Sequence, residues 1–209
     1  MIKPYYSQDG ITIYNADCRD VLPQLESVDL LLTDPPFGLG NFVQVTGNVR
    51  GEKVTWNESP PDAALFEIMH AKSKHRIIWG ANYFNCFEPD GGAIVWVKNQ
   101  PMPDFSKADI ASCSFHKRVE IYTQTWTNFV NTKETNHPCE RPVSLYAWCL
   151  KKYASAGNLI LDPFMGSGSV LRAAKNCNLN AIGIEVNERY AEIAAKRMAQ
   201  SAFNFEEVA

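Results

Sequence analysis

The chain has 209 residues, of which 45% are hydrophobic and 21% are charged, a composition that excludes a disordered or low-complexity protein. No apolar run is long enough to span a bilayer, and the first ten residues lack the apolar core of a secretory signal. The six cysteines are scattered without a CxxC pair. We therefore expect a cytoplasmic protein with a single domain over residues 1–209, without disulfide bonds and without a metal site.

Charge is distributed unevenly along the chain. The net charge of −3 argues against a nucleic-acid-binding protein. Residues 98–152, however, carry 8 basic side chains against 5 acidic ones, whereas residues 1–97 carry 7 against 12. The segment 98–152 is therefore where a phosphate backbone would be attracted, although a solvated polar face explains the same excess equally well.

The predicted elements alternate between strands and helices. Hydrophobic runs predict strands at residues 11–14, 28–33, 77–79, 93–97, 119–126, 158–161 and 181–184. Helical spacing predicts helices at residues 18–25, 62–73, 141–153, 169–177 and 188–199. The run at 28–33 is apolar on both faces, which is typical of a central parallel strand. This alternation predicts an α/β fold with a doubly wound, mostly parallel sheet.

Residues 38–60 are rich in glycine, asparagine, valine and threonine and lack periodicity. Long loops inside compact domains are usually functional, so we expect a mobile loop there. The helix that follows is expected to bury one apolar stripe, formed by Ala64, Leu65, Ile68 and Met69.

A glycine-containing loop lies in the segment 161–186, which has the pattern strand, loop, helix, strand and then an acidic residue. Gly166 and Gly168 let the backbone approach a ligand, and Glu185 stands where such units place a carboxylate against ribose hydroxyls. Leu171 replaces the third glycine of the dinucleotide fingerprint, which favours a nucleoside without a pyrophosphate. A tight strand-to-helix turn without a ligand is the alternative.

The second candidate site follows the apolar strand at 28–33 and consists of Asp34, Pro35, Pro36 and Phe37. Ligands of open α/β sheets bind at the carboxyl ends of parallel strands. The Asp34 carboxylate and the Pro35 carbonyl suit the two hydrogens of an amino group on a flipped base, and Phe37 offers a stacking face. A rigid turn that merely ends the strand is the alternative.

The chemistry of such an amino group explains this combination. Its lone pair is delocalised into the ring, and two acceptors aimed at its hydrogens favour a pyramidal, nucleophilic nitrogen. Catalysis would then rest on positioning and preorganised acceptors, without a covalent intermediate.

With DPPF early and DPFMGSG late, the chain resembles the β-class amino-methyltransferases of DNA, and most of all small phage or prophage members. Three further segments carry this resemblance: NADC at 15–18, IWGANYF at 78–84 and HPCERPVSL at 137–145. The resemblance implies a Rossmann-like methyltransferase fold with circularly permuted motifs and S-adenosylmethionine as cofactor. It also implies methylation of adenine N6 in double-stranded DNA by base flipping, a role in restriction–modification and, by family habit, a homodimer.

The resemblance also implies roles for individual residues. The catalytic set is Asp34, Pro35, Pro36 and Phe37. The cofactor set is Asp17, Cys18, Asp34, Pro142, Ser144, Asp162, Phe164, Gly166, Gly168 and Glu185. The DNA set is Arg50, Lys53, Trp56, Asn82, Tyr83, Lys117 and Arg118, and target recognition is expected in a small insertion at residues 98–136. For that insertion, an edge strand with solvated lysines is the alternative.

The chain departs from the family pattern at three positions. Arg141 replaces a lysine, Phe37 a tyrosine and Ala81 a glycine, and none of these changes removes a group that the mechanism needs. Asp34 favours adenine over cytosine by family association. Methylation of cytosine N4, methylation of RNA or of a protein glutamine amide, and a binding module without activity stay open as alternatives.

Overall fold

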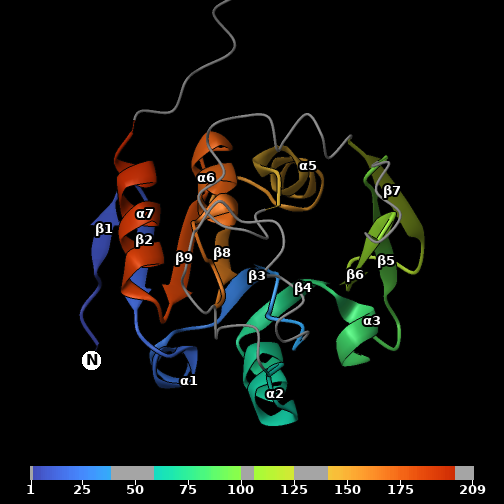
Figure 1. The fold of residues 1–209 in the computed structure, drawn as a ribbon, viewed down its shortest axis with the longest axis horizontal. Coiled ribbons are helices and arrows are strands. Elements are labelled where there is room, and N and C mark those ends of the chain that lie inside the picture. The colour runs from blue at the N-terminus through green and yellow to red at the C-terminus, as the bar shows by residue number, and fades with distance from the viewer. Residues whose placement is uncertain (1, 39–58, 100–105, 125–140, 201–209) are drawn as a thin grey trace, which may run out of the picture.

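The computed structural model describes residues 2–38, 59–99, 106–124 and 141–200. Within these ranges a nine-stranded sheet has the order β1-β2-β9-β8-β3-β4-β6-β5-β7 (Figure 1). The strands are β1 (Tyr6–Gln8), β2 (Ile11–Asn15), β3 (Val28–Thr33), β4 (Ser73–Trp79), β5 (Gly92–Val97), β6 (Ala108–Cys113), β7 (Val119–Thr123), β8 (Leu159–Asp162) and β9 (Asn180–Glu185). The helices are α1 (Cys18–Val21), the short 3-10 helix η1 (Leu22–Gln24), α2 (Ala63–Ala71), α3 (Ala81–Phe84), α5 (Val143–Tyr153), α6 (Ser169–Asn176) and α7 (Glu188–Ala199).

The sheet is mostly parallel, as the sequence predicts. Strands β2, β9, β8, β3 and β4 are paired in parallel, and so are β5 and β7. Only β1 and β6, among the described strands, run antiparallel to their neighbours. The two late strands β8 and β9 are inserted between the early strands β2 and β3, which brings the two ends of the chain into one sheet.

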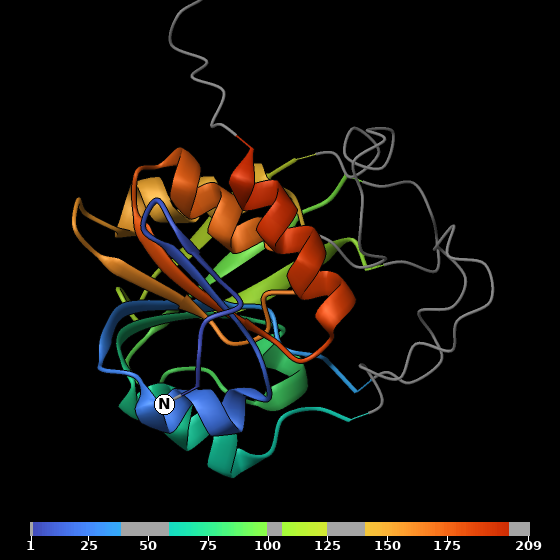
Figure 2. The same ribbon diagram turned by 90° about the vertical axis from the view of Figure 1, so that its left-hand side faces the viewer.

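Helices cover both faces of the sheet (Figure 2). Helices α5, α6 and α7 pack on one face, and α1 and α2 pack on the other. Strand β3 contributes to both layers, because Leu30 and Leu32 belong to the core under α5 and α6 whereas Leu31 belongs to the core over α2. Burial on both faces accounts for the unbroken apolar run of this strand.

Several elements differ from the sequence prediction. The apolar stripe of α2 consists of Leu65 and Met69, while Ala64 is exposed and Ile68 is only partly buried. Ser73, expected at the end of that helix, begins β4 instead. The pattern also missed β1, β6 and α3, because these elements are short or carry polar residues such as Asp109. None of the described helices is both long and apolar enough to cross a membrane.

Candidate active site

The two sequence motifs meet at neighbouring strand ends. Strands β3 and β8 are paired in parallel, so the DPPF motif after Thr33 and the DPFMGSG motif, which begins at Asp162 in the last position of β8, leave the same edge of the sheet. The Thr33 hydroxyl donates a hydrogen bond of 2.7 Å to Asp162. The same Asp162 oxygen accepts the backbone N–H of Phe164 at 3.1 Å. This buried bridge joins the last residues of β3 and β8, so the two loops that follow them start side by side.

Asp34 is bound by a buried arginine. Arg141 donates two hydrogen bonds to the Asp34 carboxylate, from Nε to Oδ2 at 2.7 Å and from Nη2 to Oδ1 at 2.9 Å. Its remaining terminal nitrogen, Nη1, donates to Asp109 on β6. The Arg141 side chain is 5% exposed, and the Asp34 side chain is 22% exposed. The Asp34 carboxylate is thus held by one arginine while keeping partial access to solvent.

Aromatic rings surround this ion pair. The guanidinium carbon of Arg141 lies 5.1 Å from the ring centroid of Trp79 and 5.8 Å from those of Phe37 and Trp96. These distances are within the range of cation–π attraction, so the rings hold the guanidinium between them. The Phe37 ring itself is stacked on Tyr83 of α3, with centroids 4.6 Å apart and planes 18° apart.

Gly80 permits this stacking. It has a φ of +76°, which favours glycine, and a Cβ atom at this position would overlap the Phe37 ring. A small cavity of about 60 Å³ lies beside the stacked rings, lined by Phe37, Asn82, Tyr83 and Asp109 among others. The structure therefore brings together the DPPF motif and the segment 78–84.

The glycine-containing loop is fastened to β9 by Glu185. This carboxylate accepts the backbone N–H of Gly166 at 3.0 Å and that of Asn187 at 2.8 Å. Gly166 and Gly168 have φ angles of +52° and +84°, and Gly168 caps the N-terminus of α6. These conformations are strained for other residues, so the two glycines set the shape of the loop.

Asp17 and Cys18 lie next to this loop. They follow β2, whose last residue pairs with Glu185 at the end of β9. Asp17 caps α1 by accepting the backbone N–H of Arg19 at 2.8 Å, and Cys18 is buried. Burial raises the pKa of the Cys18 thiol to about 12, so this side chain is neutral near pH 7. The ends of β2, β9, β8, β3 and β4 thus form one continuous edge that carries both motifs.

The comparisons with known proteins agree with this geometry. A family model described as DNA methylase matches residues 61–196, which is more than half of the chain. The chain belongs to this family.

Two relatives are type II methyltransferases. M.HpaI of Haemophilus parainfluenzae is 31% identical over 85% of this chain and 70% of the relative. M2.DpnII of Streptococcus pneumoniae is 24% identical over 95% of this chain and 93% of the relative. The chain is therefore a DNA methyltransferase, and the match extends over nearly its whole length.

Solved structures share the fold of this methylase. The M1.HpyAVI–SAM complex has a TM-score of 0.63 and 23% identity, covering 90% of this chain and 99% of that one. The cytosine-N4-specific PvuII DNA methyltransferase has a TM-score of 0.65 and 15% identity, covering 98% of this chain and 92% of that one.

Burial sets the protonation of the acidic groups in the methylase. It raises the pKa of Asp162 to about 7 and raises the pKa of Glu185 above its usual value. Burial likewise raises the pKa of Asp34, against the opposing effect of Arg141. For Asp109 the balance is reversed, because Arg141 and Lys98 outweigh burial and hold its pKa below the usual value. Among the described residues, no cluster of His, Cys, Asp and Glu could hold a metal ion.

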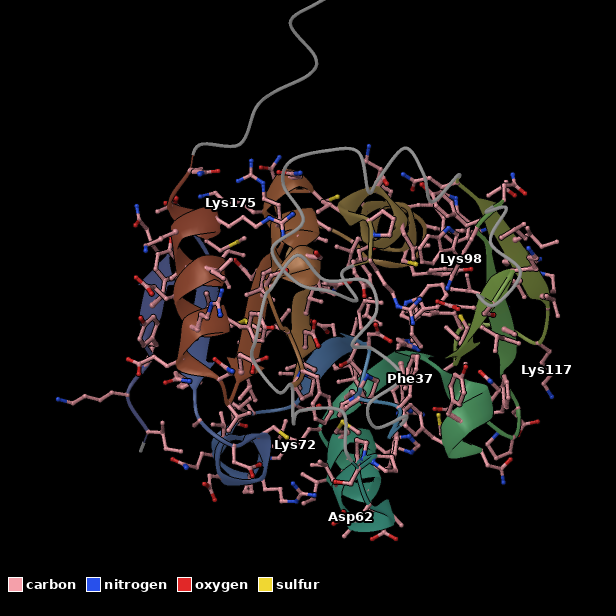
Figure 3. The ribbon with its side chains drawn as sticks, in the orientation of Figure 1. Phe37, Asp62, Lys72, Lys98, Lys117 and Lys175 are labelled. Carbon is pink, nitrogen blue, oxygen red and sulfur yellow. The ribbon has the colours of Figure 1, made fainter. Side chains whose placement is uncertain are left out.

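Two residues expected to contact DNA lie away from this edge of the methylase. Lys117 and Arg118 lie in the turn from β6 to β7, next to the first residues of β5, which is the opposite edge of the sheet (Figure 3). Lys117 pairs there with Asp90. Pro142, directly after Arg141, is the N-cap of α5, and the Ser144 hydroxyl donates to Gln124 just beyond the end of β7. Arg50, Lys53 and Trp56 lie outside the described residues.

Two residues of this site were not identified as such from the sequence. Asp109 stands on a strand that the pattern did not predict, so nothing pointed to its carboxylate. Lys98 begins the segment 98–136 in which target recognition is expected, yet its ammonium pairs with Asp109 at 2.7 Å and its side chain is only 16% exposed. Pairing across strands, which depends on tertiary structure, brings both to Arg141.

Proposed function

We propose that this methylase transfers a methyl group from S-adenosylmethionine to the N6 amino group of an adenine flipped out of double-stranded DNA. The arrangement that carries the proposal is the bridge from Thr33 to Asp162, which sets the Asp34 loop beside the glycine-containing loop. A donor and an acceptor bound to these two loops would lie in one cavity.

The loop after β8 suits a nucleoside cofactor. The positive φ angles of Gly166 and Gly168 let the backbone come close to a ligand, and Glu185 keeps lone pairs free for ribose hydroxyls beyond the two N–H groups that it accepts. We expect Asp17, at the adjoining end of β2, to contact the adenine end of the cofactor, and Asp162 and Phe164 to complete the binding site. The SAM complex of M1.HpyAVI supports this assignment. The bound cofactor would supply an electrophilic sulfonium methyl group.

The residues of the DPPF motif would prepare the acceptor. Asp34 and the Pro35 carbonyl would accept the two amino hydrogens and orient the nitrogen lone pair toward the glycine-containing loop. Asp34 must be ionised to accept in this way. Arg141 favours the ionised form, and the partial exposure of Asp34 leaves room for a second hydrogen-bonding partner.

The base would stack on Phe37, where Tyr83 now lies. The adjoining cavity of about 60 Å³ has room for roughly four water molecules, at about 15 Å³ each, which is far less than a purine needs. Tyr83 is 48% exposed and therefore free to swing outward. We infer that base entry displaces the Tyr83 ring and that Asn82 then lines the enlarged pocket.

Adenine is favoured over cytosine because Asp34 stands in the first position of the motif. The cytosine-N4-specific PvuII enzyme shares the fold, so the fold does not discriminate between the two bases. The experiment is mass spectrometry of nucleosides from duplex DNA treated with the purified protein and S-adenosylmethionine. N6-methyladenine is the expected product, whereas N4-methylcytosine alone would contradict the choice of base.

Target recognition is proposed for residues 98–136, outside the strands of the sheet. β6 and β7 belong to the sheet itself, and β5 ends, β6 begins and β7 ends at the edge that carries Asp34. The chain that connects to these strand ends is thus attached beside the site. We further propose that the protein acts in the cytoplasm as a homodimer, which the exposed apolar side chains of β7 support.

A further inference from the structure

We propose that Asp109 is a positioning residue for methyl transfer: by sharing Arg141 with Asp34, it limits how tightly Arg141 occupies the acceptor oxygens of Asp34. The inference rests on the proposed role of Asp34 as an acceptor for the target amino group. It assigns a function to a carboxylate on β6 that no sequence motif contains.

The contacts of Arg141 carry the inference. Its guanidinium donates hydrogen bonds from Nε and Nη2 to Asp34 and from Nη1 to Asp109, so the two carboxylates bind opposite sides of one cation. The rings of Trp79, Trp96 and Phe37 surround the same guanidinium and keep it from leaving the site. Arg141 therefore moves, if at all, only between its two carboxylate partners.

The charges in this cluster balance. Asp34 and Asp109 supply two negative charges, and Arg141 and Lys98 supply two positive ones. Lys98, which is labelled in Figure 3, also has its ammonium 5.3 Å from the ring centroid of Trp96, and this contact helps to hold the ammonium beside Asp109. Without the Asp109 charge, two cations would face the single carboxylate of Asp34. Arg141 would then bind Asp34 alone, and the carboxylate would become a weaker acceptor for an amino group.

The electrostatic effect on Asp34 has a definite sign. The charged and titratable groups that act on it are Arg141 and Lys98, which favour its ionised form, and Asp109, which disfavours it. Tyr146 and Asp162, which are buried nearby, are coupled to Asp34 as well. Removing the Asp109 charge therefore lowers the pKa of Asp34, and the acid limb of the methyl-transfer rate moves to lower pH.

The experiment compares Asp109→Asn with the wild type and with Asp29→Asn. Asp29 pairs with Lys74 at 2.7 Å, as Asp109 pairs with Lys98, but it lies on β3 near the opposite edge of the sheet. Single-turnover methyl transfer to duplex DNA is measured from about pH 5.5 to 9, together with the KM for DNA. Asp109→Asn should lower the plateau rate by about tenfold or more and shift its acid limb to lower pH, with little change in KM. Asp29→Asn should leave both the plateau rate and the acid limb of the pH profile unchanged.

A second readout does not depend on activity. The carboxyl pKa of Asp34 is followed by NMR titration of the full-length protein, and Asp109→Asn should lower it. Lys98→Met, which removes a cation instead, should raise it, so either variant alone tests the inference if the other folds poorly. Asp109→Glu should restore most of the rate.

Two outcomes overturn the inference. Asp109 has only a structural role if the pKa of Asp34 stays the same in both variants. The same conclusion follows if Asp109→Asn lowers the rate without shifting the acid limb of the pH profile. A wild-type protein that transfers no methyl group to DNA instead refutes the proposed function, and the NMR titration then still decides whether Asp109 tunes Asp34.

Discussion

The proposed catalytic carboxylate, that of Asp34, is 22% exposed, and both of its oxygens already accept hydrogen bonds from Arg141. A carboxylate has about four acceptor sites, so a base amino group and a guanidinium are able to share it. This sharing would make Arg141 part of the proposed active site rather than a residue that merely precedes α5.

Asp34→Ala should abolish methyl transfer while largely preserving the affinity for S-adenosylmethionine. The acceptor for the amino group is lost, but the loop around Gly166 is held by Glu185 rather than by Asp34. Methyl transfer is measured with labelled cofactor, and binding by calorimetry. Full activity in this variant would show that the chemistry lies elsewhere.

Glu185→Ala should weaken cofactor binding by about 1–3 kcal/mol, the range for a lost hydrogen bond to a charged group. The variant removes both the proposed ribose acceptor and the anchor of the Gly166 N–H. Glu188→Ala, in the exposed first turn of α7, is the matched control and should bind normally. Equal affinities of the two variants by calorimetry would refute the ribose assignment.

At the scale of elements, the site depends on how closely the loop after β3 approaches the loop after β4. Gly80 joins β4 to α3 and faces the Phe37 ring. Gly157, before β8, has a similar φ of +85°, yet a Cβ atom there would meet nothing within 4 Å. A side chain at either position would strain the backbone, but only a side chain at position 80 would also overlap a neighbouring residue.

Gly80→Ala should therefore reduce methyl transfer sharply, because its methyl group displaces the Phe37 ring. Gly157→Ala should cost about 1 kcal/mol of stability, as left-handed backbone does for non-glycine residues, and leave the rate unchanged. Methyl-transfer rates and urea unfolding of both variants provide the check. Equal rates would mean that the Phe37 position is not required.

Asp162, the buried carboxyl group in the bridge between β3 and β8, makes the stability of the fold depend on pH. Burial raises the pKa of Asp162 to about 7, so the folded state binds its proton more tightly than the unfolded state does. The contribution of Asp162 to stability is then greatest at low pH and is lost as pH rises toward about 7.

Asp162→Asn should remove this dependence while its amide oxygen still accepts from Thr33 and Phe164. Relative to the wild type, the variant should gain up to about 1.4 kcal/mol of unfolding free energy per pH unit between about pH 5 and 7. Urea unfolding at several pH values measures the difference. A constant difference across this range would contradict the raised pKa.

At the scale of the whole molecule, the sheet ends in an edge strand with an apolar surface. Val119 and Ile121 of β7 are 65% and 64% exposed, and their partners on β5 lie on the same side of the sheet. Exposed apolar side chains on an edge strand favour association with another chain.

If β7 forms the interface of the proposed homodimer, Ile121→Asp should produce monomers. Light scattering after size-exclusion chromatography should give the mass of two chains for the wild type and of one for the variant. Lys117→Gln, in the exposed turn before β7, also changes the net charge by −1 and is the control that should stay dimeric. A wild-type monomer would refute the dimer, and a dimeric Ile121→Asp would place its interface elsewhere.

The sequence determined the order of elements and the two motifs, because strands, helices and tight turns carry local signals. VDLLLT is recognisable as a doubly buried strand, and Gly166, Gly168 and Glu185 are recognisable by their spacing. The central strands and the main helices accordingly begin and end within a few residues of their predicted bounds.

Only the tertiary structure decided which side chains meet. Strand pairing joins residues that are distant in the chain, so the contacts of Arg141 with Asp34 and Asp109 leave no local signal, and neither does the stacking of Tyr83 on Phe37. The same pairing moves Lys117 to the opposite edge, although its charge suggested DNA. Charge and residue type are properties of the sequence, whereas the edge of the sheet on which a side chain emerges depends on strand direction and order.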